Sequence, residues 1–386
     1  METLTAPLFI LTILCLNIVI SEWLVARTFC KHFGTALLVI LLTAVWANLG
    51  LIPSASNAST LYDVIFSYVA PIGIFFLLLE VNLKNLRRAG LPMLLLFLIG
   101  ALATVLGAVI GMWAVSGKSS IGPLYQAIGG MFTGTYIGGS INFNAIALHY
   151  EVTRDGTLYA GAIAVDNILT TLWMVVTIAV PKMLSRSQPA RLGEGQIDST
   201  DDKALHQDES ETLSPLSMSF LLGLGMLALW ISNQTTALFA RAGITVPSIL
   251  ILTTIALALA QMPVLSRMKG ARLLGLFSVY LFLAVIGAYC ELSALSNIGA
   301  LGLTLLLFVT VLVLVHGIVL FGFGAIFKQD WDMVAIASQA NIGGSTSALA
   351  LAKSLNRRDL YLPAILVGSL GNGIGTYLGF LVIKLI

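Results

Sequence analysis

Long apolar stretches follow one another along nearly the whole chain and are separated by short polar segments. An apolar stretch of about 20 residues matches the helix length that crosses the roughly 30 Å hydrocarbon core of a bilayer. The pattern therefore predicts an all-α polytopic membrane protein with about 11–13 transmembrane helices. The expected helices cover residues 6–26, 35–51, 62–79, 90–115, 121–150, 158–183, 214–238, 247–265, 272–295, 299–325, 332–354 and 360–385.

Composition supports this interpretation, because 58% of the 386 residues are hydrophobic and only 10% are charged. A water-soluble domain of this size could not cover its surface with so few charged groups. The first apolar run, residues 6–26, lacks a preceding basic region and is longer than a cleaved signal segment, so we expect it to be the first membrane helix. We expect a multi-pass protein of the cell's inner (plasma) membrane, with the lipid bilayer as a partner and no nucleic acid.

Residues 185–214 differ from the rest of the chain in composition. They contain Ser, Gly and Pro and several acidic residues, among them Asp201 and Glu211. Such a segment cannot bury enough apolar surface to fold, so we expect a disordered linker. It divides the chain into a first membrane repeat, residues 1–184, and a second one, residues 215–386.

The two halves resemble each other when the sequence is shifted by 205 positions. The shift places Ile137–Ser140 on Ile342–Ser345 without a gap, and Asn167 on Asn372. Internal repeats are a common architecture of secondary transporters. The spacing therefore predicts a duplicated unit of about five or six helices.

The basic residues raise a question about orientation. Arg27, Arg87 and Arg88 mark loops that the positive-inside rule places in the cytoplasm. With twelve full helices, Arg267 would then lie outside, and two six-helix repeats would share one orientation. An odd total, eleven or thirteen helices, restores an inverted repeat, which is the arrangement that we expect.

One glycine pair lies inside the predicted helix 121–150 and another inside 332–354. Glycine permits non-helical dihedrals, and unwound backbone inside a bilayer is tolerated only where protein or water satisfies its polar groups. Two such breaks are typical of ion and solute sites, since half-helix ends carry partial charges. The alternative is close helix packing, which small residues also serve. The candidate site residues are Thr133, Thr135, Tyr136, Gly138, Gly139, Ser140 and Asn142 in the first segment and Asn341, Gly343, Gly344, Ser345 and Thr346 in the second.

An acidic residue, Asp166, lies within the next predicted helix beside Asn167. A carboxylate inside a membrane helix is costly and by default functional. It can coordinate Na⁺ or take up and release a proton, so Asp166 and Asn167 are candidate Na⁺ ligands. The alternative is that Asp166 lies near a helix end or is neutral and hydrogen-bonded. In the second half, Asn372 and Thr376 complete the candidate site.

Several other polar residues allow two interpretations each. Glu80 and Glu291 follow long apolar runs and are either interfacial anchors or residues near the solute path. His316 is either a proton relay or a hydrogen-bonded core residue. The three cysteines show neither metal-ligand spacing nor a pairing pattern. Neither a Walker loop nor a set of nucleophile and base is visible, so we expect no enzyme, no ATP-driven transport and no cofactor other than Na⁺.

These motifs carry a resemblance that covers most of the chain. Residues 131–143, 164–167, 340–344 and 368–376 make the sequence similar to the bacterial and plastid membrane family catalogued as domain of unknown function 819. That family is in turn remotely similar to the superfamily of cation/proton antiporters and bile-acid/sodium symporters. The resemblance implies two discontinuous crossing helices inside an inverted repeat, an ion site at Asp166 and Asn167, a homodimer, and a core domain that moves like an elevator against a scaffold.

The sequence therefore predicts a secondary active transporter, coupled to Na⁺ or H⁺, for a small anionic or zwitterionic solute such as an amino acid, a peptide or a carboxylate. One alternative is a monovalent cation/proton antiporter without an organic solute. Another is a membrane receptor or scaffold that keeps the transporter frame without flux. The pattern does not rank individual solutes.

Overall fold

The computed structural model describes residues 6–28, 34–81, 83, 86–184, 214–244, 246–263, 265, 269–290 and 298–386. Within these ranges the chain forms helices and no strands, as the apolar pattern predicts. The predicted linker falls outside the described residues except for Ser214, whose hydroxyl caps the following helix.

The described residues include eight helices that are long and apolar enough to cross a membrane. Two shorter apolar helices, α2 (Gly34–Asn48) and α12 (Ser248–Ala260), bring the total to ten of the twelve predicted segments. The eight long ones are α1 (Pro7–Arg27), the continuous run of α3 (Thr60–Val64), η4 (Ile65–Val69) and α4 (Ala70–Leu78), then α5 (Leu91–Ala114), α9 (Gly156–Leu184), α11 (Pro215–Arg241), α13 (Ala271–Ala288), α14 (Ile298–Ile326) and α17 (Tyr361–Leu385).

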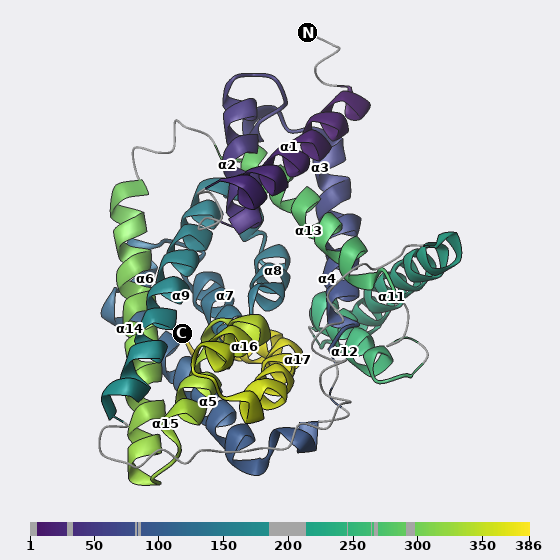
Figure 1. The fold of residues 1–386 in the computed structure, drawn as a ribbon. Coiled ribbons are helices and arrows are strands. Elements are labelled where there is room, and N and C mark those ends of the chain that lie inside the picture. Colours follow the sequence, from purple (N-terminus) through teal and green to yellow (C-terminus); the bar gives the residue numbers. More distant parts are fainter. Residues whose placement is uncertain are drawn as a thin grey trace.

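The helices pack as two bundles, which Figure 1 shows on either side of a gap in the ribbon. The scaffold bundle contains α1, α2, α3–α4, α11, α12 and α13, with α13 packed between α2 and α4. The core bundle contains α5, α9, α14, α17 and the shorter helices between them. Most close contacts lie within a bundle, while α4 with α8, α9 with α13 and α2, and α12 with α17 connect the two.

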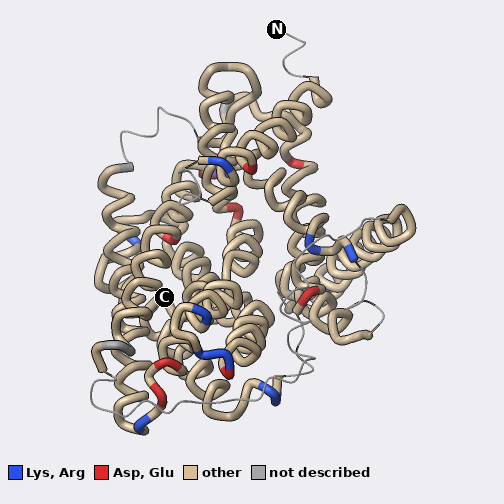
Figure 2. The backbone as a smooth tube through the Cα atoms, in the orientation of Figure 1, with Lys and Arg blue, Asp and Glu red and all other residues tan. Residues whose placement is uncertain are grey.

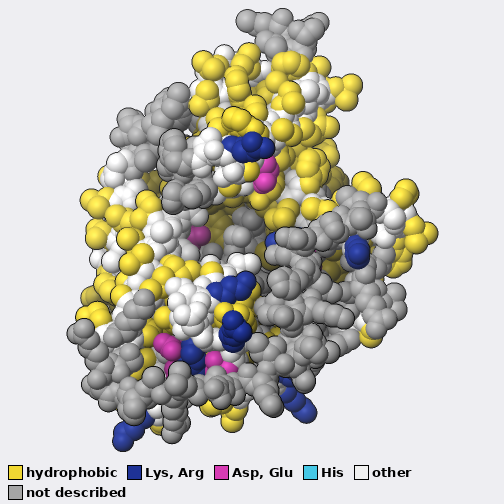
Figure 3. All heavy atoms as spheres, in the orientation of Figure 1, with side chains coloured by type: hydrophobic (Ala, Val, Ile, Leu, Met, Phe, Trp, Pro, Cys, Tyr) yellow, Lys and Arg dark blue, Asp and Glu magenta, His cyan; other side chains and the backbone are white. Residues whose placement is uncertain are grey.

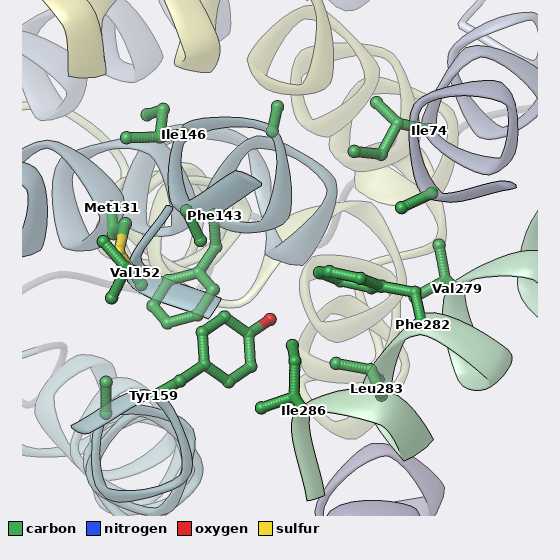
Figure 4. Close-up of a cluster of buried hydrophobic side chains, with 14 of the residues drawn as sticks. Ile74, Met131, Phe143, Ile146, Val152, Tyr159, Val279, Phe282, Leu283 and Ile286 are labelled. Carbon is green, nitrogen blue, oxygen red and sulfur yellow. The ribbon is translucent and has the colours of Figure 1, made fainter. Parts of the chain in front are cut away.

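Apolar side chains fill the contact between the bundles near the start of α9. Tyr159 of α9 packs edge-on against Phe143 of the core and against Phe282 of the scaffold, with ring centroids 5.4 and 6.4 Å apart. Figure 4 shows these three rings together, with Ile286 and Leu283 of α13 beside them. Burial of apolar area, rather than hydrogen bonding, therefore holds this part of the interface.

Residues 121–150 form a helical hairpin, which we call hairpin 1. It consists of α7 (Tyr125–Gly138) and α8 (Ser140–His149), joined at Gly139, whose φ is 92°. The rings of Phe132 and Phe143 stand 5.8 Å apart, and a Cβ on Gly134 would be 3.0 Å from the Cδ1 atom of Ile146. In one continuous helix these last two residues would be about 18 Å apart, so the chain folds back on itself.

Residues 331–354 form a second hairpin, hairpin 2. Its arms are α15 (Trp331–Ile342) and α16 (Gly344–Ser354). Arg357, just beyond the end of α16, donates to the carboxylate of Asp330, the N-cap of α15, at 2.7 Å. Both ends of the hairpin therefore lie at the same place, and the chain returns to where it entered.

The expectation of two discontinuous helices that cross the membrane is therefore wrong in geometry. The physical reason is the left-handed glycine at each break, Gly139 with φ 92° and Gly344 with φ 74°, which reverses the chain instead of kinking it. These glycines are 205 positions apart. Glu151 and Asn356, which follow the two hairpins, are also 205 apart and also have positive φ. The matched turns support the predicted repeat.

The hairpins remove the conflict between helix count and charge pattern. When α2 and α12 are counted with the eight long helices and the hairpins are not counted, each half has five candidate crossings, and an odd number per half gives the second half the opposite orientation. The total among the described residues is then ten, which differs from the odd total expected from the sequence. The basic residues then segregate between the face at the end of α1 and the face at its start. On the former lie Arg27, Arg87, Arg88, Lys182, Lys269, Arg272, Lys328, Lys353, Arg357 and Arg358, and on the latter Lys118, Arg154, Arg241 and Lys384. The positive-inside rule places the former in the cytoplasm, and most of the charged residues lie near helix ends (Figure 2).

Cysteine labelling tests this topology. In a variant without Cys15, Cys30 and Cys290, a cysteine at Ser119 is expected to react with a membrane-impermeant maleimide in intact cells. A cysteine at Gln329 is expected to react only after the membrane is permeabilised, because five crossings separate the two positions. Labelling of both positions from the same side would contradict the non-crossing hairpin.

Candidate functional site

Hairpin 1 is fixed to α17 by two facing rows of glycines. Gly130, Gly134 and Gly138 of α7 oppose Gly379, Gly375 and Gly371 of α17. A Cβ added to Gly138 would lie 2.0 Å from the carbonyl oxygen of Gly371, and one added to Gly130 would lie 2.9 Å from that of Gly379. Glycines four residues apart on two helices are a known signal for close backbone packing. Close packing is the alternative interpretation of the glycine pairs, although the prediction from the sequence did not include the longer row from Gly130 to Gly138.

Two predicted site residues, Asn142 and Thr376, contact each other across the same boundary. The Oδ1 atom of Asn142 accepts from the Thr376 hydroxyl at 2.7 Å and from the Thr376 N–H at 3.1 Å. The Nδ2 atom of Asn142 donates to the Gly371 carbonyl at 3.5 Å. Both side chains are buried, so these bonds fasten hairpin 1 to α17 and use the groups that an ion would need.

Asp166 has a different environment. Its carboxyl group lies beside the hydroxyls of Tyr136 on α7 and Thr170 on α9. Its Oδ1 atom is buried and makes no hydrogen bond within the described part of the chain. A carboxylate oxygen with two neighbouring hydroxyls is a set of hard oxygen ligands suited to Na⁺ or to a proton. Thr170 was not among the predicted site residues, although it lies one helical turn after Asp166.

The remaining candidates in hairpin 1 and on the neighbouring helices α9 and α17 have different surroundings. The Thr133 hydroxyl donates to the Gly129 carbonyl within α7, and the backbone carbonyl of Thr135 accepts from the Gly139 N–H at the turn. Asn372 of α17 lies at the tip, with its Oδ1 atom 3.7 Å from the Cβ position of Gly139. The backbone carbonyl of Asn167 accepts from Thr171, and Ser140 is exposed.

At hairpin 2, Asn341 donates to the carbonyls of Phe97 and Ala337, while its buried Oδ1 atom has no partner among the described residues. Ser345 lies against Gly368 of α17, and Thr346 is exposed. At the open end of the hairpin, Arg357 bonds three carboxylates. These hydrogen bonds, the one to Asp359 foremost, hold the pKa of Arg357 well above its usual range.

His316 is a hydrogen-bonded core residue. Its Nδ1 atom lies 3.0 Å from the Gly100 carbonyl and its Nε2 atom 2.9 Å from the Ser338 hydroxyl, which also accepts from Trp173 Nε1 at 2.9 Å. A neutral ring that donates from Nδ1 and accepts at Nε2 satisfies every one of these groups. This geometry favours the structural interpretation over the proton relay. Glu80 lies just beyond the end of α4, as an interfacial anchor would, and Glu291 lies outside the described residues.

A cavity of about 240 Å³ lies between the bundles, at the outer end of hairpin 1. Its lining includes His149, Glu151 and Arg154 of the core and Ser67 and Asn233 of the scaffold. Figure 3 shows the surface hollowed between the two bundles in this region. Beside it, Arg154 pairs with Asp63 of α3 at 3.5 Å and with Glu151 at 3.3 Å, so one ion pair joins the core to the scaffold. Sequence patterns gave no sign of this pair.

Comparisons with known proteins agree with the motifs. A family model described as "Protein of unknown function (DUF819)" matches residues 9–386. The chain is also similar to the "Uncharacterized membrane protein YjcL" of Bacillus subtilis (strain 168), with 28% identity over 348 residues, which cover 87% of this chain and 85% of the relative.

Proposed function

The chain belongs to the DUF819 family of membrane proteins, and we propose that it is a secondary active transporter, coupled to Na⁺ or H⁺, for a small anionic or zwitterionic solute. One observation carries the proposal: two hairpins reverse at glycines and pack against α9 and α17, and Tyr136 of hairpin 1 lies beside the carboxyl group of Asp166, whose Oδ1 atom is buried. Irregular backbone inside a membrane helix bundle is retained where it forms an ion or solute site.

The two-bundle packing supports an elevator type of alternating access. In this proposal the core bundle, which holds both hairpins, moves against the scaffold and exposes its site first on one side and then on the other. The few contacts between the bundles would keep the cost of this movement low. The scaffold would form the interface of a homodimer in the inner membrane.

Coupling would arise at Asp166. A charged Asp166 is costly to move through the apolar interface, so the empty core would stay in place until a cation or proton neutralises it. Loading the ion and the solute together would then permit movement. This arrangement requires no further energy source than the ion gradient.

The test begins with purified protein. Its Tm is measured against Na⁺, K⁺ and pH, crossed with a panel of amino acids, small peptides and carboxylates. A solute that raises Tm only together with Na⁺, or only at low pH, and that enters proteoliposomes down a gradient of the same ion, would support the proposal. Binding of a solute without flux under any gradient would contradict it and favour a receptor.

The cation/proton antiporter is the second candidate, because a carboxylate with two hydroxyls needs no organic solute to serve as an ion site. It predicts that cations alone raise Tm. It also predicts that a Na⁺ or K⁺ gradient changes the pH inside proteoliposomes that contain no organic solute.

The ion pair between Asp63 and Arg154 allows a test of movement between the bundles. Both side chains are about half exposed, so Asp63→Asn is expected to change stability by less than about 1 kcal/mol. Where the pair holds the core on the scaffold, its loss changes the energy needed to separate the two bundles by the same amount. The uptake rate then changes by up to about fivefold. The control is Glu151→Gln, which removes the partner of Arg154 within the core. Equal uptake rates in both variants and the wild type would show that the pair does not restrain the core.

A further inference from the structure

Hairpin 2 contains a helix that begins without a cap. α16 starts at Gly344, its N-cap residue is Gly343, and no side chain caps it. The first N–H groups of a helix have no partner within the helix and carry partial positive charge. α15 on the same hairpin is capped, because the Asp330 carboxylate accepts from the N–H groups of Asp332 and Met333. The start of α16 is thus the terminus of this hairpin that a ligand can cap.

A buried amide group points at the same place. The Gln339 side chain is fully buried, and its Oε1 atom accepts from the Thr177 hydroxyl at 3.2 Å, whereas its Nε2 atom has no hydrogen-bond partner in the part of the chain that the structure describes. Nε2 lies 2.4 Å from the point where a Cβ on Gly343 would stand, and the Ser347 hydroxyl lies 2.8 Å from that point. An unpaired buried N–H group is costly, so an acceptor from outside the chain is expected here.

One glycine leaves open space at this terminus, because a Cβ built on Gly344 would meet no atom within 4 Å. The two glycines around it are tightly packed. A Cβ on Gly343 would lie 2.4 Å from Gln339 Nε2, and one on Gly368 of α17 would lie 2.6 Å from the backbone nitrogen of Ser345, in the first turn of α16. A ligand would therefore reach the start of α16 from the side of Gly344.

Hairpin 1 lacks this arrangement at the corresponding place. α8 also begins uncapped, after Gly139. However, Gly138 is pressed against the Gly371 carbonyl, and the Asn142 amide is already bonded to α17 on both of its polar atoms. The two hairpins therefore differ, and only the second pairs its open helix start with an unpartnered buried donor among the described residues.

We infer that the start of α16, together with Gln339 Nε2 and the Ser347 hydroxyl, forms a binding site for a carboxylate group. All of these groups donate hydrogen bonds, and a carboxylate is an acceptor whose charge the helix end favours. The inference rests on the proposed transport function for the identity of the ligand, which is the carboxylate end of the solute. The cation is then bound separately, at Asp166.

The test measures Tm of the purified protein with acetate, glycine or succinate, and with acetamide as the neutral analogue of acetate. At least one carboxylate, but not acetamide, is expected to raise Tm. The variant Gln339→Glu keeps the acceptor that faces Thr177 but removes the free amide donor and adds negative charge. It is expected to weaken the apparent Kd by about tenfold or more, the effect of losing one hydrogen bond to a charged group.

The matched control is Gln329→Glu, the same substitution ten positions earlier, where the side chain donates to the nearby Phe327 carbonyl. It is expected to bind as the wild type does. Should Gln339→Glu fail to fold, Ser347→Ala decides, because it leaves Gln339 intact, removes the second side-chain donor of the site and is expected to weaken binding. An unchanged Kd in the folded variant, equal stabilisation by acetamide, or no stabilisation by any of the carboxylates would overturn the inference. Intact carboxylate binding without uptake would instead count against the proposed function alone.

Discussion

Gly138→Val is expected to prevent the native packing of hairpin 1 and to lower the yield of monodisperse protein sharply. A Cβ at this position would lie 2.0 Å from the carbonyl oxygen of Gly371 and 2.5 Å from the Asn142 amide. Backbone atoms cannot rotate away as a side chain can, so α7 and α17 would have to separate. Overpacking in a well-packed interior costs about 1–3 kcal/mol, and we expect the upper end or more for a contact with backbone. The measurement is Tm in detergent, together with the elution profile in gel filtration.

The control for this prediction is Gly223→Val. Gly223 lies within α11, and a Cβ there would meet no atom within 4 Å. The variant has the same change in helix propensity but no clash, so its Tm is expected to remain within a few degrees of the wild type. If Gly138→Val were as stable as Gly223→Val, the close contact between α7 and α17 would be wrong.

The positions of the membrane helices could be predicted from the sequence, because the length and hydropathy of each segment are local properties. Ten of the twelve expected segments appear as single helices or as one continuous run. The linker was also predicted from a local property, its composition, but it lies outside the described residues except for Ser214. The relative orientation of the two halves could not be predicted from local sequence, because it depends on whether the two remaining segments cross the membrane.

The hairpins could not be predicted, since a glycine pair in an apolar run is compatible with a kink and with a reversal. What distinguishes them is contact between residues far apart in the sequence, such as Arg357 with Asp330. The breaks themselves were predicted correctly at Gly139 and Gly344. The positive-inside rule would have indicated the hairpins if the two glycine-containing segments had been allowed not to cross the membrane. Five crossings per half then place most of the basic loops on one side.

The sequence predicted one site from a set of polar residues and glycines. In the structure these residues lie in separate environments. Asn142 and Thr376 were expected to bind the solute or an ion, yet they bond each other across 234 positions of sequence, a pairing that no single-sequence pattern reports. Gln339 was missed because a glutamine in an apolar helix has no motif. Its significance comes from the unpartnered nitrogen beside Gly343, which is visible only in three dimensions.

Asp166→Asn is expected to abolish ion-dependent stabilisation and ion-driven uptake while the protein still folds. Asparagine has nearly the same shape as aspartate, so the contacts with Tyr136 and Thr170 remain possible. It removes the negative charge that attracts a cation and the carboxyl group that takes up a proton. Because the buried Oδ1 atom has no hydrogen-bond partner among the described residues, the change also removes a desolvation cost of up to about 3 kcal/mol, and Tm without ions is expected to equal or exceed that of the wild type.

The matched control is Asp155→Asn, the same substitution in the segment before α9. The Asp155 carboxylate accepts from the Leu158 N–H at 2.9 Å, and an asparagine oxygen accepts equally well at a helix start, so uptake and ion dependence should stay as in the wild type. The measurements are Tm against Na⁺ concentration and pH, and uptake into proteoliposomes under an ion gradient. Ion-dependent uptake that survives in Asp166→Asn would move the coupling site elsewhere, whereas a lower Tm in the absence of ions would mean that Asp166 supports the fold instead of an ion.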